Sequence, residues 1–356
     1  RVPSPLAGDE RRHVEAFGMD HVEYILVERQ QGDRYATTSG TVLFDGERQG
    51  VMSWLDAPSA MGALEFFSPQ STLAGAFVFR DPAQLFEEMQ SMVVKVSQRE
   101  LEIPSDVEYH ASALAALGGE FAFGVDGPTL PVPAWKFVIE VYDAARLQDA
   151  LGELITHINS QASEGSARLV MTEHTTEGTV SYEIGLAGNA DDTDVDAGLV
   201  SANYAYVDGY LVAAPSRALL QRAIQYYESG SSLVVSSAFR DLLPTDGYLD
   251  FSGVAFSRLS AAARDLLGGV TSVALTDEQV EIVRQLGNES PSLLAVYAET
   301  DKLRMVVNGD AGWPVSSLPQ ILGVMTLLQQ MGIRHDADEA SDPGDQTEST
   351  MEPIAA

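Results

Sequence analysis

The residues with the most ligand-like spacing in this sequence are three aspartates in one short acidic stretch. Asp192, Asp194 and Asp196 alternate with small residues and match the first three ligand positions of a calcium-binding loop. The glycine that such a loop needs comes one position late, at Gly198, and the twelfth position holds Asn203 instead of a bidentate glutamate. A solvated acidic linker is therefore the favoured interpretation, and a weak calcium site is the alternative.

No other group of residues has the spacing of a known catalytic or cofactor site. The sequence lacks glycine-rich nucleotide loops, the His-Glu-x-x-His zinc motif and the Gly-x-Ser-x-Gly nucleophile elbow. Cysteine is absent, which excludes a thiol nucleophile and a disulfide framework. We therefore assign no catalytic residue and no cofactor, and we expect a non-catalytic protein. A hydrolase whose site is assembled from distant residues stays an alternative.

The charge balance limits the classes of partner. The 356 residues include 52 Asp and Glu against 21 Lys and Arg, which gives a net charge of −31, and 45% of the residues are hydrophobic. Such a chain can bury a core, but the phosphates of nucleic acid repel it. A basic carrier protein such as a cytochrome is instead attracted. No uncharged apolar run is long enough to predict a transmembrane helix.

One long segment near the C-terminus is depleted of charge. Residues 311–333 contain no Asp, Glu, Lys or Arg, whereas 21% of the whole chain is charged. Charge depletion is typical of interface cores, so this segment is a candidate docking helix. A helix that closes the second domain is the favoured structural interpretation, because its apolar residues lie on one helical face, and the docking helix is the functional alternative. The candidate interaction residues are Trp313, Leu318, Ile321, Leu322, Met325 and Leu328.

The elements that would position these residues follow a recurring phrase: an apolar strand, a small polar residue, then an amphipathic helix. Asp81, Asp143 and Ser216 occupy the polar position, where a side-chain oxygen can accept hydrogen bonds from the first turn of a helix. Pro82 follows the first of them, at a helical position that tolerates its missing N–H. We therefore predict helices that begin directly after these three capping residues.

The larger order of elements predicts an internal duplication. A first pass of predicted elements is followed by a second at an offset of roughly 125–135 residues. The predicted fold class is α+β, with two tandem copies of an antiparallel-sheet unit and helices packed on one face. The first pass holds a hairpin near 62–79, helices near 83–96 and 111–117, strands at 120–125 and 136–142, a helix at 144–159 and a hairpin at 168–186. The second holds a hairpin at 203–214, helices at 217–228 and 237–243, a strand at 247–252, helices at 256–267 and 277–286 and a hairpin at 293–308.

Domain boundaries follow from this reading. Residues 20–190 and 199–333 are expected to form the two repeats, joined by the acidic linker 191–198. Residues 1–19 mix proline, glycine and charge, and residues 334–356 are acidic and rich in serine, threonine and proline. Both ends offer too little apolar surface to form a packed core, so we expect a flexible N-terminal segment and a disordered acidic tail.

Three stretches, 52–85, 119–155 and 204–252, resemble an uncharacterised bacterial family of exported proteins of unknown function. The resemblance lies in a strand–Asp–helix phrase that precedes a Tyr-x-Tyr pair, here Tyr204 and Tyr206, and the segment Asp-Gly-Tyr-Leu-Val at 208–212. It continues into Ser216 with Leu219 and Leu220. The resemblance implies a periplasmic or cell-surface protein, often tethered to the membrane. It implies no catalytic residue.

These observations favour a non-catalytic extracytoplasmic accessory or scaffold subunit that docks on a membrane-associated protein complex. An electron-transfer complex, photosynthetic or respiratory, is one such partner, because its basic carriers suit the acidic chain. The alternative is a periplasmic carrier or sensor of a small apolar ligand, held in a groove on the open face of a sheet. The residues that would line this groove are aromatic residues on predicted strands, namely Phe77, Phe79, Phe121, Phe123, Tyr204, Tyr206 and Tyr210.

Overall fold

The structure is a computed structural model of the chain. It describes residues 18–88, 108–126, 134–163, 167–176, 178–187, 201–258 and 290–309. All of these residues belong to one compact unit, Arg1–Pro314, and the second unit, Val315–Ala356, lies outside the described residues.

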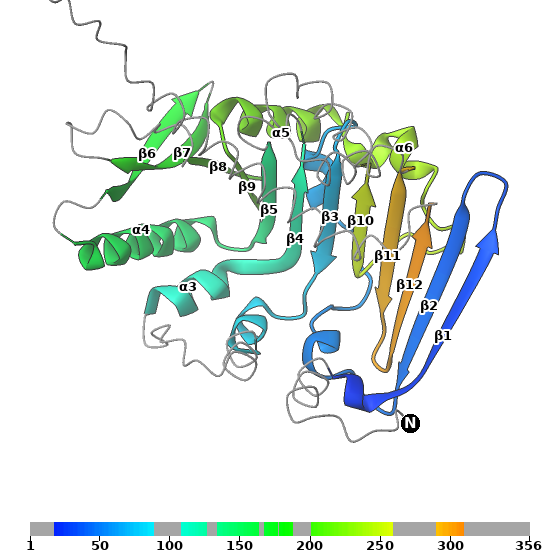
Figure 1. Cartoon of the computed structure of the whole chain (residues 1–356). Coiled ribbons are helices and arrows are strands. Elements are labelled where there is room, and N and C mark those ends of the chain that lie inside the picture. The colour runs from blue at the N-terminus through cyan, green and yellow to red at the C-terminus, as the bar shows by residue number, and fades with distance from the viewer. Residues whose placement is uncertain are drawn as a thin grey trace, which may run out of the picture. The chain divides into compact units, whose positions relative to one another are not determined.

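The described part of the chain is built on one twelve-stranded sheet with the order β1-β2-β12-β11-β10-β3-β4-β5-β9-β8-β7-β6 (Figure 1). Every neighbouring pair is antiparallel. The expected α+β class with an antiparallel sheet is therefore confirmed. The strands are β1 Val22–Gln31, β2 Ala36–Phe44, β3 Leu73–Val78, β4 Leu117–Val125, β5 Trp135–Val141, β6 Arg168–Thr176, β7 Thr179–Ala187, β8 Ala202–Val207, β9 Tyr210–Ala214, β10 Gly253–Ser257, β11 Ser292–Ala298 and β12 Lys302–Asn308.

Helices lie on both faces of this sheet, whereas the sequence pattern suggested one face. On the first face, Leu220 and Ile224 of α5 (Arg217–Ser229) and Phe239 of α6 (Ser237–Arg240) pack in one cluster with Val138 and Val212. On the second face, residues of α3 (Glu108–Ala116) and α4 (Ala144–Gln161) pack on Val141, Tyr204 and Leu211. Strand alternation explains the difference, because neighbours such as Leu211 and Val212 are both apolar and point to opposite faces. Both faces therefore need a cover. Short 3-10 helices complete the fold at Met19–His21, Gly50–Ser53, Ala63–Phe66 and Leu233–Val235.

The three predicted capping residues all cap helices. Asp81 Oδ1 accepts a hydrogen bond from the N–H of Ala83 at 2.8 Å, and residues 82–88 are helical. Asp143 Oδ1 accepts from the N–H of Arg146 at 3.0 Å at the start of α4, and Ser216 Oγ accepts from the N–H of Leu219 at 3.4 Å at the start of α5. The local sequence therefore predicted these helix starts correctly.

Three local predictions were wrong. The hairpin expected near 62–79 is a 3-10 helix at Ala63–Phe66 followed by the single strand β3. The strand expected at 247–252 begins at Gly253, and Phe256, expected in a helix, belongs to β10. Phe256 is fully buried between its partners on β3 and β11, so tertiary packing overrides its local helical pattern. The β1–β2 hairpin was not predicted.

Candidate functional site

Six aromatic side chains at the centre of the sheet lie on one face as two neighbouring groups of three, which we together call the aromatic strip. Direct cross-strand partners supply it: Phe77 of β3 lies opposite Phe121 of β4, and Phe123 lies opposite Phe137 of β5. The rings of Phe123 and Phe137 have centroids 4.9 Å apart, within the range of favourable aromatic pairs. The strip comprises Phe77, Phe79, Phe121, Phe123, Trp135 and Phe137.

Glycines on the neighbouring strands make room for these rings. A Cβ built on Gly253 of β10 would lie 2.6 Å from Cδ1 of Phe77, closer than real atoms approach. Gly75 lies directly opposite Phe123, so no side chain stands beside that ring on β3. The glycines therefore let the phenyl rings spread across adjacent strands. Glycine in a strand interior weakens that strand, and here it leaves space for a neighbouring ring.

The strip lies partly open to solvent. Phe123 is 40% exposed and Phe137 is 45% exposed, although both belong to central strands. The clusters on either side of the strip on this face are closed: Val296 and Leu294 are buried with Met52 and Leu55, and Tyr204 is buried against α4. Clustered aromatic rings exposed between two covered regions mark an interaction surface more often than scattered single residues do.

Charged residues on the opposite face of the same strands are buried and paired. Lys136 Nζ lies 2.5 Å from Asp126 Oδ2 and donates a second hydrogen bond to the carbonyl oxygen of Phe66 at 2.7 Å. Asp126 also accepts from the N–H of Ser68 and from the hydroxyl of Ser71. Burial would raise the pKa of Asp126, but the Lys136 ammonium and these donors hold it below its ordinary value. The pair is fully satisfied, so it holds the fold and has no free group for chemistry.

A second buried carboxylate has a different protonation tendency. Glu120 accepts hydrogen bonds from the N–H of Ala63 at 2.8 Å, from the N–H of Gly62 at 3.2 Å and from the Tyr210 hydroxyl at 2.7 Å. Burial nevertheless raises its pKa, and the neighbouring Glu140 carboxylate adds to this effect. Burial raises the pKa of Tyr210, and the Glu120 carboxylate that its hydroxyl donates to adds to this effect. Glu120 fixes the turn before Ala63–Phe66 to the sheet and is closed to substrate.

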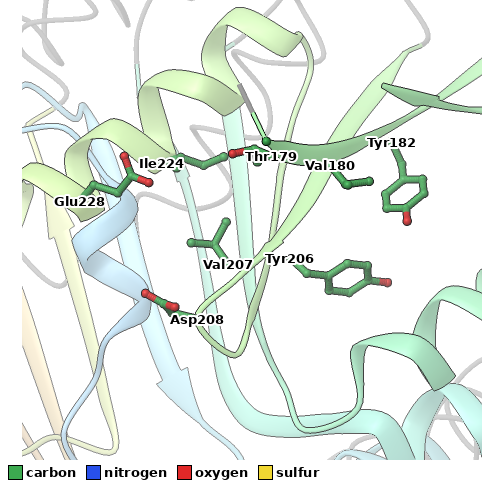
Figure 2. Close-up of a pocket in the computed structure, with 9 residues that line it drawn as sticks. Thr179, Val180, Tyr182, Tyr206, Val207, Asp208, Ile224 and Glu228 are labelled. Atoms are coloured by element: carbon green, nitrogen blue, oxygen red, sulfur yellow. The ribbon is translucent and has the colours of Figure 1, made fainter. Parts of the chain in front are cut away.

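An open hollow of about 370 Å³ lies between α5 and the ends of β7 and β8 (Figure 2). Asp208 and Glu228 lie on one side of the strands, and the rings of Tyr182 and Tyr206 extend on the other side, as Figure 2 shows. A neighbouring hollow of about 610 Å³ shares Thr179, Ile224 and Glu228 with it. No nucleophile lies paired with a general base among these lining residues.

Three titratable side chains, those of His174, Glu183 and Arg217, form a cluster beside these hollows. Glu183 Oε2 lies 3.1 Å from His174 Nε2 and 3.5 Å from Arg217 Nη2. All three side chains are partly exposed, which makes these ion pairs weak. Within the described ranges, no group of three or more His, Asp or Glu residues could hold a metal ion. The described surface therefore offers contact area and polar groups for binding.

Two sets of predicted site residues lie outside the described residues. The calcium candidates Asp192, Asp194 and Asp196 lie outside the described residues, as do the interaction candidates Trp313, Leu318, Ile321, Leu322, Met325 and Leu328.

The aromatic groove expected for a small apolar ligand is not one surface. Phe77, Phe79, Phe121 and Phe123 do lie together, in the aromatic strip. Tyr204 and Tyr206 share that face but lie beside α4, where both hydroxyls donate to Gln148 Oε1, at 2.9 and 3.3 Å. Tyr210 packs on Phe66 in the cluster of the other face. Sequence reasoning missed Trp135 and Phe137: Phe137 lies on the predicted strand 136–142, but Trp135 lies just before it, and β5 begins one residue earlier than predicted.

Comparison with family models, with curated proteins and with solved structures found no match for this chain. Among the helices of the described ranges, none has the length and apolar character needed to cross a membrane.

Proposed function

We propose that this protein is a non-catalytic accessory or scaffold subunit that docks on a membrane-associated protein complex through the aromatic strip. The half-exposed rings of Phe123 and Phe137 carry this proposal. Aromatic residues are enriched at the energetic centres of protein interfaces, where rigid rings bury much apolar area at little entropic cost. The strip lies on central strands of a continuous sheet, so docking there needs no rearrangement of the backbone.

The charge of the chain supports the choice of partner. A net charge of −31 attracts a basic carrier protein, such as a cytochrome, to an electron-transfer complex on which this subunit sits, photosynthetic or respiratory. The family resemblance of residues 52–85, 119–155 and 204–252 supports a place in the periplasm or at the extracytoplasmic face of the membrane. The uncharged segment 311–333 supplies a second proposed contact.

We also propose that the scaffold is duplicated, with repeats within 20–190 and 199–333. The strand order supports a duplication, but with other equivalences than the predicted offset of roughly 125–135 residues: β3 and β10 pair at the centre, and their first residues, Leu73 and Gly253, lie 180 positions apart. The hairpin β4–β5 lies next to β3, as the hairpin β11–β12 lies next to β10. The N-terminal hairpin of each half is exchanged: β1–β2 pairs with β12, and β8–β9 pairs with β5. In this arrangement β6 and β7 belong to the first half in sequence, and they have no equivalent strands among the described residues of the second half.

Affinity purification of the tagged chain from gently solubilised membranes that contain the natural partner tests the docking proposal. The tagged double variant Phe123→Gln/Phe137→Gln is compared with wild type and with Tyr142→Ser, a control at a site that is 73% exposed outside the strip. We expect wild type and the control to co-purify stoichiometrically with one membrane complex, and the double variant to lose it. A photo-crosslinker at position 137 is expected to label a subunit of the same complex.

Two outcomes would count against the proposal. Recovery of the folded wild-type chain alone would refute the docking role. Equal recovery of the complex by wild type and the double variant would place the docking surface elsewhere. A small apolar molecule released from the purified chain in native mass spectrometry, and lost in the double variant, would favour the carrier alternative.

A further inference from the structure

The edge strand β1 has an exposed apolar centre. Tyr24, Ile25, Leu26 and Val27 are consecutive, and each is more than half exposed, from 51% to 59%. Strand residues alternate between the two faces, so side chains on both faces of β1 are exposed, and no other strand of the described ranges pairs with its outer edge. Edge strands in natural proteins are normally protected by lysine, proline or a cover, and an unprotected apolar edge invites pairing with another strand. The described edge on the other side of the sheet, β6, is more polar.

The hydrogen bonds of the β1–β2 hairpin show which groups of this edge are free. The N–H of Gly32 donates to the carbonyl of Tyr35 at 3.0 Å at the end of the hairpin. In an antiparallel ladder such bonding residues alternate, so the even-numbered residues from Tyr24 to Gln30 face β2. The backbone N–H and C=O groups of Ile25, Val27 and Arg29 therefore point away from β2, toward the free edge.

We propose that two copies of this chain associate by antiparallel pairing of their β1 strands about Leu26, which joins the two sheets into one. An outward-facing residue must pair with another outward-facing residue. Pairing about Leu26 satisfies this rule, because Ile25 lies opposite Val27 of the second copy and Val27 lies opposite its Ile25.

The side chains suit the same register. Around the twofold axis, Ile25 and Val27 of both copies form an apolar cluster on one face, and the two Leu26 side chains meet on the other. At the ends of the pairing, Arg29 of each copy lies near Glu23 of the other, which is the bulged residue between Val22 and Tyr24, so the long side chains bring opposite charges together twice. If the strand of the second copy is shifted by two residues, Ile25 lies opposite Arg29, and Arg29 no longer meets Glu23. Charge complementarity therefore selects a second copy in this register.

The expected dimer is weak, because a single strand pair buries less than the roughly 1,200 Å² typical of stable complexes. Sedimentation velocity from about 1 to about 200 µM protein covers the affinities expected of such an interface. We expect the wild-type chain to pass from monomer to dimer within this range at about 0.15 M salt, where long-range repulsion between the acidic copies is screened. A purified chain that stays monomeric throughout would refute the proposal and leave β1 to a different partner.

Two sets of variants test the register. Val27→Pro removes an outward N–H without removing a bond to β2, so it should abolish dimerisation and keep the circular dichroism spectrum of wild type. Arg29→Glu should weaken the dimer at least tenfold by facing Glu23 with a like charge, and Glu23→Arg/Arg29→Glu should restore it. Dimerisation that survives Val27→Pro, or a double swap that fails to restore it, would overturn the proposal.

The absence of cysteine allows a direct check of the twofold axis. Leu26 faces its symmetry mate as a non-hydrogen-bonded pair with Cα atoms about 4.5 Å apart, within the range that a disulfide spans. Leu26→Cys should therefore cross-link to a covalent dimer under mild oxidation, whereas Tyr142→Cys, 73% exposed on another part of the surface, should not. Equal cross-linking of both variants would show random collision and contradict the pairing.

Discussion

Lys136 Nζ and Asp126 Oδ2 lie 2.5 Å apart in the core, and each side chain is only 3% exposed. Lys136 lies on β5 and Asp126 directly follows β4, and the second face of these neighbouring strands carries the aromatic strip. Lys136 also lies over the rings of Phe67 and Tyr226, at 5.1 and 5.5 Å from their centroids. The strands that present the exposed rings are therefore anchored from the opposite face by a buried, fully paired charge.

Removal of the ammonium group should destabilise the fold strongly. We expect Lys136→Met to lower the free energy of unfolding by about 3–5 kcal/mol at pH 7, because Asp126 becomes an uncompensated buried charge. Lys302→Met, which breaks a partly exposed pair with Glu299, should cost at most about 1 kcal/mol. Urea unfolding followed by tryptophan fluorescence measures both values, and equal costs would contradict the buried-pair account.

The acid dependence of this cost gives a second readout of the same pair. In the wild type the folded pKa of Asp126 lies below its ordinary value of 3.8, so its contribution is present above that value and is lost as pH falls through the folded pKa. In Lys136→Met the unpaired carboxyl favours its protonated form, so the deficit should shrink from pH 7 to pH 4. Lys136→Met/Asp126→Asn should be more stable than the single variant at pH 7.

Glu120 should affect stability with the opposite sign. Its folded pKa lies above its ordinary value of 4.5, so its contribution is present below 4.5 and is lost as pH rises through the folded pKa. Relative to Glu120→Gln, which does not titrate, the unfolding free energy of the wild type should fall as pH rises from 4.5. Glu153→Gln on the exposed side of α4 is the control, and a parallel pH profile for wild type and Glu120→Gln would contradict the raised pKa.

The sequence predicted what local chemistry decides. Asp143 and Ser216 were found because a cap acts within one helical turn, and the hairpin at Asp208 was found because its turn needs two residues with positive φ. The β1–β2 hairpin was missed because β1 is exposed on both faces and shows no polar–apolar alternation.

Four of the six members of the aromatic strip were predicted, and the others were missed for a different reason. The members of the strip alternate correctly on their own strands, but which rings meet depends on strand pairing, as for Phe77 of β3 and Phe121 of β4, which lie 44 positions apart in the chain. Nothing local encodes a contact between residues so far apart in the chain. Tyr210 was misplaced for a local reason: the two-residue turn pairs it with Val207, so its side chain lies on the face opposite Tyr204 and Tyr206 and packs against Phe66.

The turn between β8 and β9 gives a prediction about backbone conformation. Asp208 and Gly209 have φ of 45° and 83°, the positive values of a two-residue hairpin turn. Gly209→Ala should lower the unfolding free energy by about 1 kcal/mol, because a side chain at positive φ is strained. Gly46→Ala, where φ is not positive and an added Cβ meets open space, should cost little. Equal thermal unfolding midpoints for the two variants would contradict the turn assignment.

The cap at Ser216 sets the start of α5, the helix that covers the first face of the sheet. Its Oγ accepts from the N–H of Leu219, so Ser216→Ala leaves that donor without its partner and should cost about 1 kcal/mol. Ser216→Asp keeps an acceptor and adds a charge that the helix N-terminus favours, so it should be at least as stable as wild type. Because Leu220 of the same first turn is fully buried, hydrogen exchange should speed up in α5 of Ser216→Ala before it does in β9. Uniform exchange across both elements would show that α5 does not open as a unit of its own.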